Sequence, residues 1–152
     1  MQFTRWAAVA ATAAMLLAGS AFAADRATPD EAKALVEKGA AHLKAVGLDK
    51  ALVDFADPQG GFMDRDLFIF LYAPDGKILS GSGNPGLIGR NALVLKDVDG
   101  KEFGKEIMAA AAAGGGWAEY RMSNPVTKKA EPKKTYAVKV GDNVVAAGAY
   151  VP

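Results

Sequence analysis

Apolar residues after position 27 first recur with the period of a helix. One stripe, spaced by three or four residues, consists of Leu35, Val36, Gly39, Leu43 and Val46. Thr28-Pro29-Asp30-Glu31 is typical of a helix start, because Thr28 and Glu31 can form a capping box and proline suits the first turn. Gly47 is suited to end this helix. The sequence predicts a shorter helix next, over Lys50–Phe55, with Asp49 as its cap.

After Gly60-Gly61 the pattern changes to the period of a strand. In Asp66–Tyr72, three aliphatic side chains alternate with three aromatic ones, so both faces of this segment are apolar. That pattern predicts a central strand covered on both sides. The turn sequence Pro74-Asp75-Gly76 then predicts an antiparallel partner strand over Lys77–Ser80.

The rest of the chain predicts one more helix and three strands. Residues 81–100 form a long connection, rich in Gly and Asn, with an apolar insert at Ala92–Leu95. A helix is expected from Asp99 to the glycines at 114–116, and strands over Trp117–Met122, Thr135–Val140 and Val144–Tyr150. Helices and antiparallel strands that stay apart along the chain indicate an α+β fold. We expect one domain, in which a five-stranded antiparallel sheet carries a long N-terminal helix, a second helix and the long loop.

The first 23 residues have the three parts of a secretory signal. Arg5 is the only charge before Asp25, Trp6–Ala18 is almost wholly apolar, and Ala21-Phe22-Ala23 is a small-residue cleavage pattern. We predict a signal peptide over residues 1–23, cleaved near Ala23, and a domain over 24–152 located in the bacterial periplasm or secreted. The alternative is an uncleaved anchor, which the alanine-rich stretch disfavours because it falls short of the ~20 strongly apolar residues of a membrane span. After cleavage no stable membrane insertion is expected.

Composition excludes several classes of function. Without Arg5 the chain keeps 17 basic residues against 17 acidic ones, so a nucleic-acid partner is not expected. There is no cysteine and His42 is the only histidine, so we expect no disulfide, no metal site and no cofactor. No nucleophile elbow or pair of acids stands out, so we expect no catalytic residues and no enzyme.

Two short motifs resemble nucleotide and calcium sites but fail in detail. Gly81–Gly86 matches G-x-G-x-x-G, yet it follows an antiparallel hairpin and its Pro and Gly are poor starts for a pyrophosphate-binding helix. Asp97-Val98-Asp99-Gly100 has the wrong register for a calcium loop, since the first ligand position would be Leu95. We interpret Asp99 as a helix cap instead.

Aromatic and basic residues gather on the late strands. Between Arg121 and Lys139 the chain has six basic residues and one acidic residue, interleaved with tyrosine. A tyrosine hydroxyl and one cation in an apolar pocket suit a small carboxylate. The alternative is that Tyr120 and Tyr136 are core or edge residues whose hydroxyls are in water.

Several runs resemble one known family when taken in order. They are Glu31–Gly47, DLFIFLYAPDG at 66–76, NP at 84–85 with LIG at 87–89, KDVDGKEF at 96–103, GGWAEY at 115–120, NPVT at 124–127, KKTY at 133–136 and AGAY at 147–150. The chain resembles the single Cache domain of type 2, the extracytoplasmic sensor module of bacterial chemoreceptors and histidine kinases. The resemblance implies a PAS-like fold and a pocket on the sheet for a small organic acid or amino acid.

The resemblance also implies the site residues. Family positions fall on Tyr120, Lys133, Tyr136 and Tyr150, and on Asn84, Pro85 and Gly89 of the long loop, while Trp117 and Arg121 are neighbours. Members often carry a histidine shortly before the Asn-Pro, where this chain has Ser80, Gly81 and Ser82. If that histidine helps to hold ligand, this chain binds something different, binds more weakly, or uses Ser80 or Ser82.

Family domains usually sit between membrane helices and signal to an output domain, whereas this sequence stops after its last strand. We therefore expect a free-standing periplasmic binding protein that orders loop 81–100 around a small carboxylate and docks on a membrane receptor or kinase. The alternatives are a structural or protein-interaction module that has lost its ligand and, third, an unrecognised enzyme.

Overall fold

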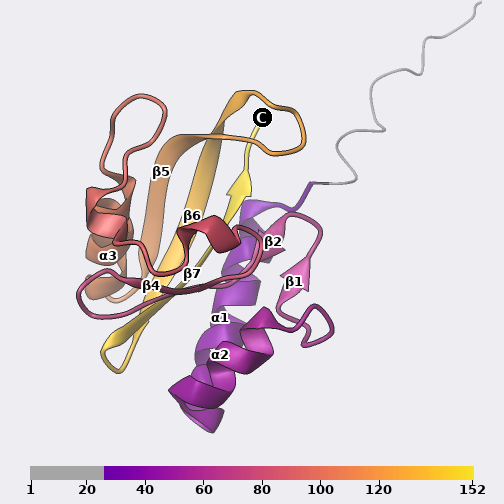
Figure 1. The fold of residues 1–152 in the computed structure, drawn as a ribbon, viewed down its shortest axis with the longest axis vertical. Coiled ribbons are helices and arrows are strands. Elements are labelled where there is room, and N and C mark those ends of the chain that lie inside the picture. The colour runs from indigo at the N-terminus through magenta and orange to yellow at the C-terminus, as the bar shows by residue number, and fades with distance from the viewer. Residues whose placement is uncertain (1–25) are drawn as a thin grey trace, which may run out of the picture.

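The computed structural model describes residues 26–152, which begin with the long helix that the sequence predicts (Figure 1). Helix α1 spans Pro29–Val46, and Thr28 and Glu31 form the expected capping box at its start. Gly39 lies where α1 crosses the sheet, since a Cβ there would approach Ile69 Cδ1 to 2.9 Å. The predicted signal peptide and its cleavage after Ala23 lie outside the described residues.

The strands form a five-stranded antiparallel sheet in the order β4-β3-β7-β6-β5 (Figure 1). Their bounds are β3 Phe70–Tyr72, β4 Ile78–Gly81, β5 Gly116–Ser123, β6 Ala130–Val140 and β7 Asn143–Tyr150. Two short strands, β1 (Met63–Asp64) and β2 (Leu67–Phe68), pair separately. The remaining elements are helices α2 (Leu48–Ala56) and α3 (Phe103–Ala112) and the 3₁₀ turns η1 (Pro85–Leu87) and η2 (Ala92–Val94). The predicted α+β architecture is confirmed.

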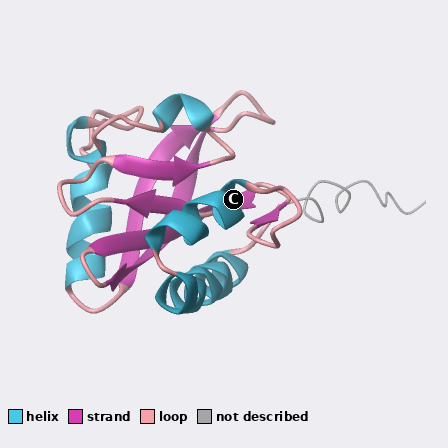
Figure 2. Cartoon of the chain, turned by 60° about the horizontal axis from the view of Figure 1, so that its bottom comes forward, coloured by secondary structure: helices cyan, strands magenta, loops and turns pink. Residues whose placement is uncertain are grey.

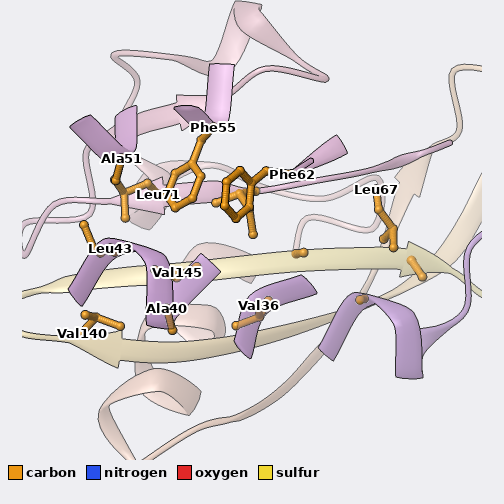
Figure 3. Close-up of a cluster of buried hydrophobic side chains, with 14 of the residues drawn as sticks. Val36, Ala40, Leu43, Ala51, Phe55, Phe62, Leu67, Leu71, Val140 and Val145 are labelled. Atoms are coloured by element: carbon orange, nitrogen blue, oxygen red, sulfur yellow. The ribbon is translucent and has the colours of Figure 1, made fainter. Parts of the chain in front are cut away.

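Helices cover the sheet from both sides, and each side has its own core (Figure 2). On one side α1 and α2 pack on aliphatic residues of the sheet, around Val36, Phe55 and Val145 (Figure 3). On the other side α3 and the long loop pack on the aromatic face, around Phe70 and Tyr72. The predicted alternation of residues 66–72 is confirmed, because its aliphatic positions join the first core and its aromatic positions face the second.

Three local predictions were wrong. Helix α2 begins at Leu48 with Gly47 as its N-cap, so Asp49 lies inside the first turn rather than capping it. Helix α3 begins at Phe103 with Glu102 as its N-cap, so Asp99 caps no helix. The strand expected over Asp66–Tyr72 is broken into β2 and β3.

A buried aspartate explains the turn where the third helix was expected to start. Asp97 Oδ1 accepts hydrogen bonds from the backbone N–H groups of Asp99 (2.9 Å) and Lys101 (2.8 Å). Its Oδ2 accepts from the N–H of Arg121 at 3.0 Å. Because these hydrogen bonds stabilise the ionised carboxylate, they lower the pKa of Asp97. The bond to Arg121 also holds the loop against the edge strand β5.

Candidate functional site

A cavity of about 590 Å³ lies on the aromatic side of the sheet. The sheet supplies its floor, including Phe70, Tyr120 and Tyr150. The loop over residues 81–100 covers it with Leu87 and Leu95, and the hairpin between β5 and β6 adds Pro125. A concave site of this size with mostly apolar walls is typical of small-molecule binding.

Lys133, on β6, brings a positive charge into this cavity. Its residue surface is only 8% exposed, and Nζ lies 4.8 Å from the centroid of the Tyr150 ring and 5.9 Å from that of Phe68. Among residues 26–152 it forms neither an ion pair nor a hydrogen bond through Nζ. Burial lowers the pKa of Lys133 to about 8, although the negative charge of Asp66 acts in the opposite direction. Lys133 is therefore a buried cation without an acidic partner in the described part of the chain.

The other charged side chains at this end of the cavity already have partners. Arg65 Nη2 lies 2.6 Å from Glu31 Oε1 and 2.7 Å from Asp64 Oδ2, and its Nη1 donates to the carbonyl oxygen of Arg26. Asp66 Oδ1 accepts a hydrogen bond of 2.9 Å from the N–H of Ala27. Lys133 is thus the cation best placed to receive an anion from solvent.

Two tyrosines flank Lys133 and hold fixed positions. Tyr150 is opposite Lys133 across the β6–β7 pair, and its hydroxyl donates to the carbonyl oxygen of Ser123 at 3.1 Å. Tyr120 is opposite Lys133 across the β5–β6 pair, and its hydroxyl lies 2.7 Å from Thr135 Oγ1. Burial raises the pKa of both tyrosines, so both hydroxyls stay neutral at pH 7.

Of the six ligand-binding residues predicted from the sequence, the structure brings Tyr120, Lys133 and Tyr150 together at the cavity. The other three do not line it. Arg121 points away and pairs with Asp99 at 3.2 Å. Trp117 and Tyr136 contact each other, with ring centroids 5.0 Å apart, and Tyr136 packs on the α1 side. Strand alternation accounts for this division, because Tyr120 and Arg121 are consecutive residues of β5 and face opposite sides.

Gly81 and Gly83 allow the segment that covers the cavity to lie close to its aromatic wall. A Cβ on Gly83 would come within 2.1 Å of the Phe68 ring, and one on Gly81 within 2.7 Å of the Phe70 ring. Asn84 and Gly83 line the cavity, whereas Ser80 and Ser82 do not. Ser82 instead donates a hydrogen bond to the carbonyl oxygen of Phe55.

Several cavity residues were not predicted from the sequence, among them the wall residues Phe68, Phe70 and Tyr72 and, at the charged end, Arg65 and Asp66. The aromatic alternation in residues 66–72 was the available signal. It predicted a covered face, but not that a cavity separates this face from its cover.

Residues 26–152 contain neither a metal-binding cluster nor a helix that could span a membrane. No cluster of three or more His, Cys, Asp or Glu side chains there is arranged to hold a metal ion. No helix in the same range is long and apolar enough to cross a membrane.

Comparison with solved structures identifies the class of fold as the Cache type. A methyl-accepting chemotaxis protein from Vibrio parahaemolyticus superposes with a TM-score of 0.66 at 22% identity, covering 80% of this chain and 86% of that one. A periplasmic sensor domain of a chemotaxis protein gives 0.62 at 21% identity, covering 81% and 90%. A Cache chemosensory domain described for carboxylic acid recognition gives 0.64 at 19% identity, covering 81% and 92%.

The chain belongs to the Single Cache domain 2 family, whose model matches residues 9–151. The resemblance inferred from the sequence runs is therefore confirmed. No curated protein matches this chain in sequence.

Proposed function

We propose that this domain binds small carboxylates outside the cytoplasm, in the periplasm, and that Lys133 is the residue that receives the carboxylate. The observation that carries the proposal is the buried ammonium group of Lys133, which lies at one end of an apolar cavity and has no acidic partner within residues 26–152. A buried charge without a partner is costly, and an incoming anion lowers that cost. One of the similar structures is described as a Cache domain that recognises carboxylic acids, which supports the same chemistry here.

Binding follows from the positions of the groups around Lys133. The carboxylate displaces water and forms a charge-assisted hydrogen bond with Nζ. Tyr150 and Tyr120, on either side of Lys133 in the sheet, limit where the acid group can sit. Arg65 also lines the cavity, but its ion pairs with Glu31 and Asp64 neutralise its charge, which leaves Lys133 as the cation for the carboxylate.

The alternative function is an interaction module without a ligand. In such a module we expect side chains to fill the place of the cavity. The cavity of about 590 Å³ favours ligand binding over that alternative. Docking on a membrane receptor or kinase, with its dependence on ligand, stays a prediction. Photo-crosslinking in intact cells, with and without added ligand, tests it by showing which membrane protein is captured.

Isothermal titration and thermal-shift measurements test carboxylate binding on residues 24–152. We expect at least one member of a panel of organic acids and amino acids to raise the melting temperature at millimolar concentration, since ligand at 100 times its Kd adds about 2.7 kcal/mol. Lys133→Met should abolish that shift. Lys134→Met is the matched control, because Lys134 is the next residue and pairs with Glu119 at 2.7 Å. No response across the panel contradicts the proposal.

A further inference from the structure

Three aromatic rings form a continuous row along one wall of the cavity, starting at Lys133. Lys133 Nζ lies 5.9 Å from the centroid of the Phe68 ring. The Phe68 and Phe70 centroids are 4.9 Å apart, and those of Phe70 and Tyr72 are 5.9 Å apart. All of these residues line the cavity. The wall that leads away from the charged group is therefore aromatic throughout.

The sheet register gives the length of this wall. Lys133 pairs with Tyr150 on β7, whereas Phe70 pairs with Ala146 and Tyr72 with Val144. Six residues of strand separate Tyr150 from Val144, which is about 20 Å at 3.3 Å per residue. Between these ends β7 has only Ala146 and Gly148 on this face, so its small side chains leave the floor open.

The far part of the cavity offers little to a polar group. Ile78, Leu87 and Leu95 line it together with the aromatic row. The Tyr120 hydroxyl is already bonded to Thr135, and among residues 26–152 no charged side chain other than Arg65, Asp66 and Lys133 lines the cavity. A ligand with a second acid group would have to bury it against these apolar walls without a partner.

The volume also exceeds what a two- or three-carbon acid needs. A cavity of roughly 150 Å³ is enough to hold benzene, whereas this one has about 590 Å³. An acetate-sized ligand would leave most of the aromatic wall in contact with water, so the hydrophobic contribution to its binding would be small.

We infer that the ligand is a monocarboxylate whose other end is an apolar group of about the size of a phenyl ring, lying along Phe68 and Phe70. This inference rests on the proposed function and narrows it. Burial of a phenylalanine-sized side chain corresponds to about 10- to 150-fold in affinity. The ring-bearing acid should therefore bind at least tenfold more tightly than propionate.

Titration calorimetry with four probes tests the inference on residues 24–152. The probes are propionate, 3-phenylpropionate, succinate and phenylalanine, and we expect 3-phenylpropionate or phenylalanine to bind at least tenfold more tightly than propionate. Comparing 3-phenylpropionate with phenylalanine shows whether the site prefers an aryl acid or an aryl amino acid. Tighter binding of either one supports the inference. Propionate or succinate binding as tightly as both overturns the inference but leaves the proposed function standing. Binding of none of these four acids overturns the inference, and the proposed function fails with it only if the whole panel of organic acids and amino acids gives no response.

The substitution Leu87→Trp should narrow the apolar part of the cavity, because Leu87 is in the loop that covers it. Leu87 lines the cavity and is only partly buried, so the larger side chain can be accommodated. We expect the affinity for 3-phenylpropionate to fall at least tenfold while that for propionate changes less than twofold. Val94→Trp is the matched control, because Val94 is in the same loop, 71% exposed, and does not line the cavity. Equal losses for both acids in Leu87→Trp contradict the inference.

A measurement on the unmodified protein covers the case in which Leu87→Trp does not fold. Nuclear Overhauser contacts between the ligand ring protons and the methyl groups of Ile78 or Leu87 are expected when 3-phenylpropionate is bound. Ring contacts confined to surface methyl groups such as those of Val94 would overturn the placement.

Discussion

Replacement of Lys133 by Met should make the ligand-free protein more stable while destroying its binding site. The change removes the ammonium group and keeps an unbranched apolar side chain of similar length. Lowering the pKa of Lys133 from 10.5 to about 8 corresponds to about 3 kcal/mol of unfavourable free energy for the protonated folded state. The loss of the contact between Nζ and the Tyr150 ring offsets about 1 kcal/mol of this. The net gain is about 2 kcal/mol, or roughly 5–10 °C in melting temperature.

The difference in unfolding free energy between Lys133→Met and the wild-type protein should depend on pH. Above pH 8 the folded wild-type protein loses the Lys133 proton, whereas the unfolded chain keeps it up to about pH 10.5. Since the unfolded state then binds more protons, wild-type stability rises with pH relative to Lys133→Met, and the gap between them closes from pH 8 to 10.5.

Urea unfolding followed by circular dichroism at pH 7, 9 and 10.5 measures the gap. Lys134→Met is the control, and an exposed ion pair of this kind changes stability by less than about 1 kcal/mol. Lys133→Met should also weaken binding of the tightest acid at least 30-fold. A Lys133→Met protein that is less stable than wild type at pH 7, or a gap independent of pH, would refute the reasoning.

Three further predictions concern the site and its support. The Kd for a carboxylate should stay constant from about pH 6, where the acid is fully ionised, to pH 8 and rise as Lys133 loses its proton above pH 8, up to tenfold per pH unit; calorimetry showing a constant Kd from pH 7 to 9.5 would contradict this. Gly83→Ala should displace the Phe68 ring and weaken aryl-acid binding at least threefold, whereas Gly86→Ala should not, because a Cβ there would lie at an ordinary contact distance of 3.8 Å from Asn84 Oδ1. Asp97→Ala leaves three backbone N–H groups without their acceptor and should lower the unfolding free energy by about 2–3 kcal/mol in denaturant titration.

Local sequence signals predicted the elements whose causes are themselves local. The capping box at Thr28 and Glu31 and the helical stripe placed α1 within a residue of its observed bounds. The alternation in residues 66–72 predicted which side chains face each core. These predictions succeeded because the hydrogen bonds and the periodicity involve residues close together in the chain.

Helix starts that depend on tertiary contacts were predicted less well. Asp99 has the right residue type for a cap, but Asp97 bonds to the N–H of Arg121, 24 residues away, and this contact fixes the turn. Asp49 was displaced because Gly47, at φ 82°, allows α2 to begin directly after α1. The local sequence gives no sign of the contact with Arg121, whereas Gly47 was a local signal for the start of α2 that was interpreted only as a helix end.

The site was predicted in part for a similar reason. Composition and family positions indicated Tyr120, Lys133 and Tyr150, which the structure brings to one cavity. The same arguments included Arg121 and Tyr136, although strand alternation alone places Arg121 opposite Tyr120. Whether Lys133 has an acidic partner among residues 26–152 depends on what Arg65 and Asp66 bind, and those contacts link segments 34 and 39 residues apart.

The order of strands in the sheet also has a consequence for when a site can exist. Strand β7 lies in the middle of the sheet, yet it follows every other strand along the chain. Until residues 143–150 emerge, β3 with β4 and β5 with β6 can form only two separate hairpins, with no surface between them on which a cavity can close. During synthesis the chain therefore cannot acquire its ligand-competent form before the last of these strands has been made.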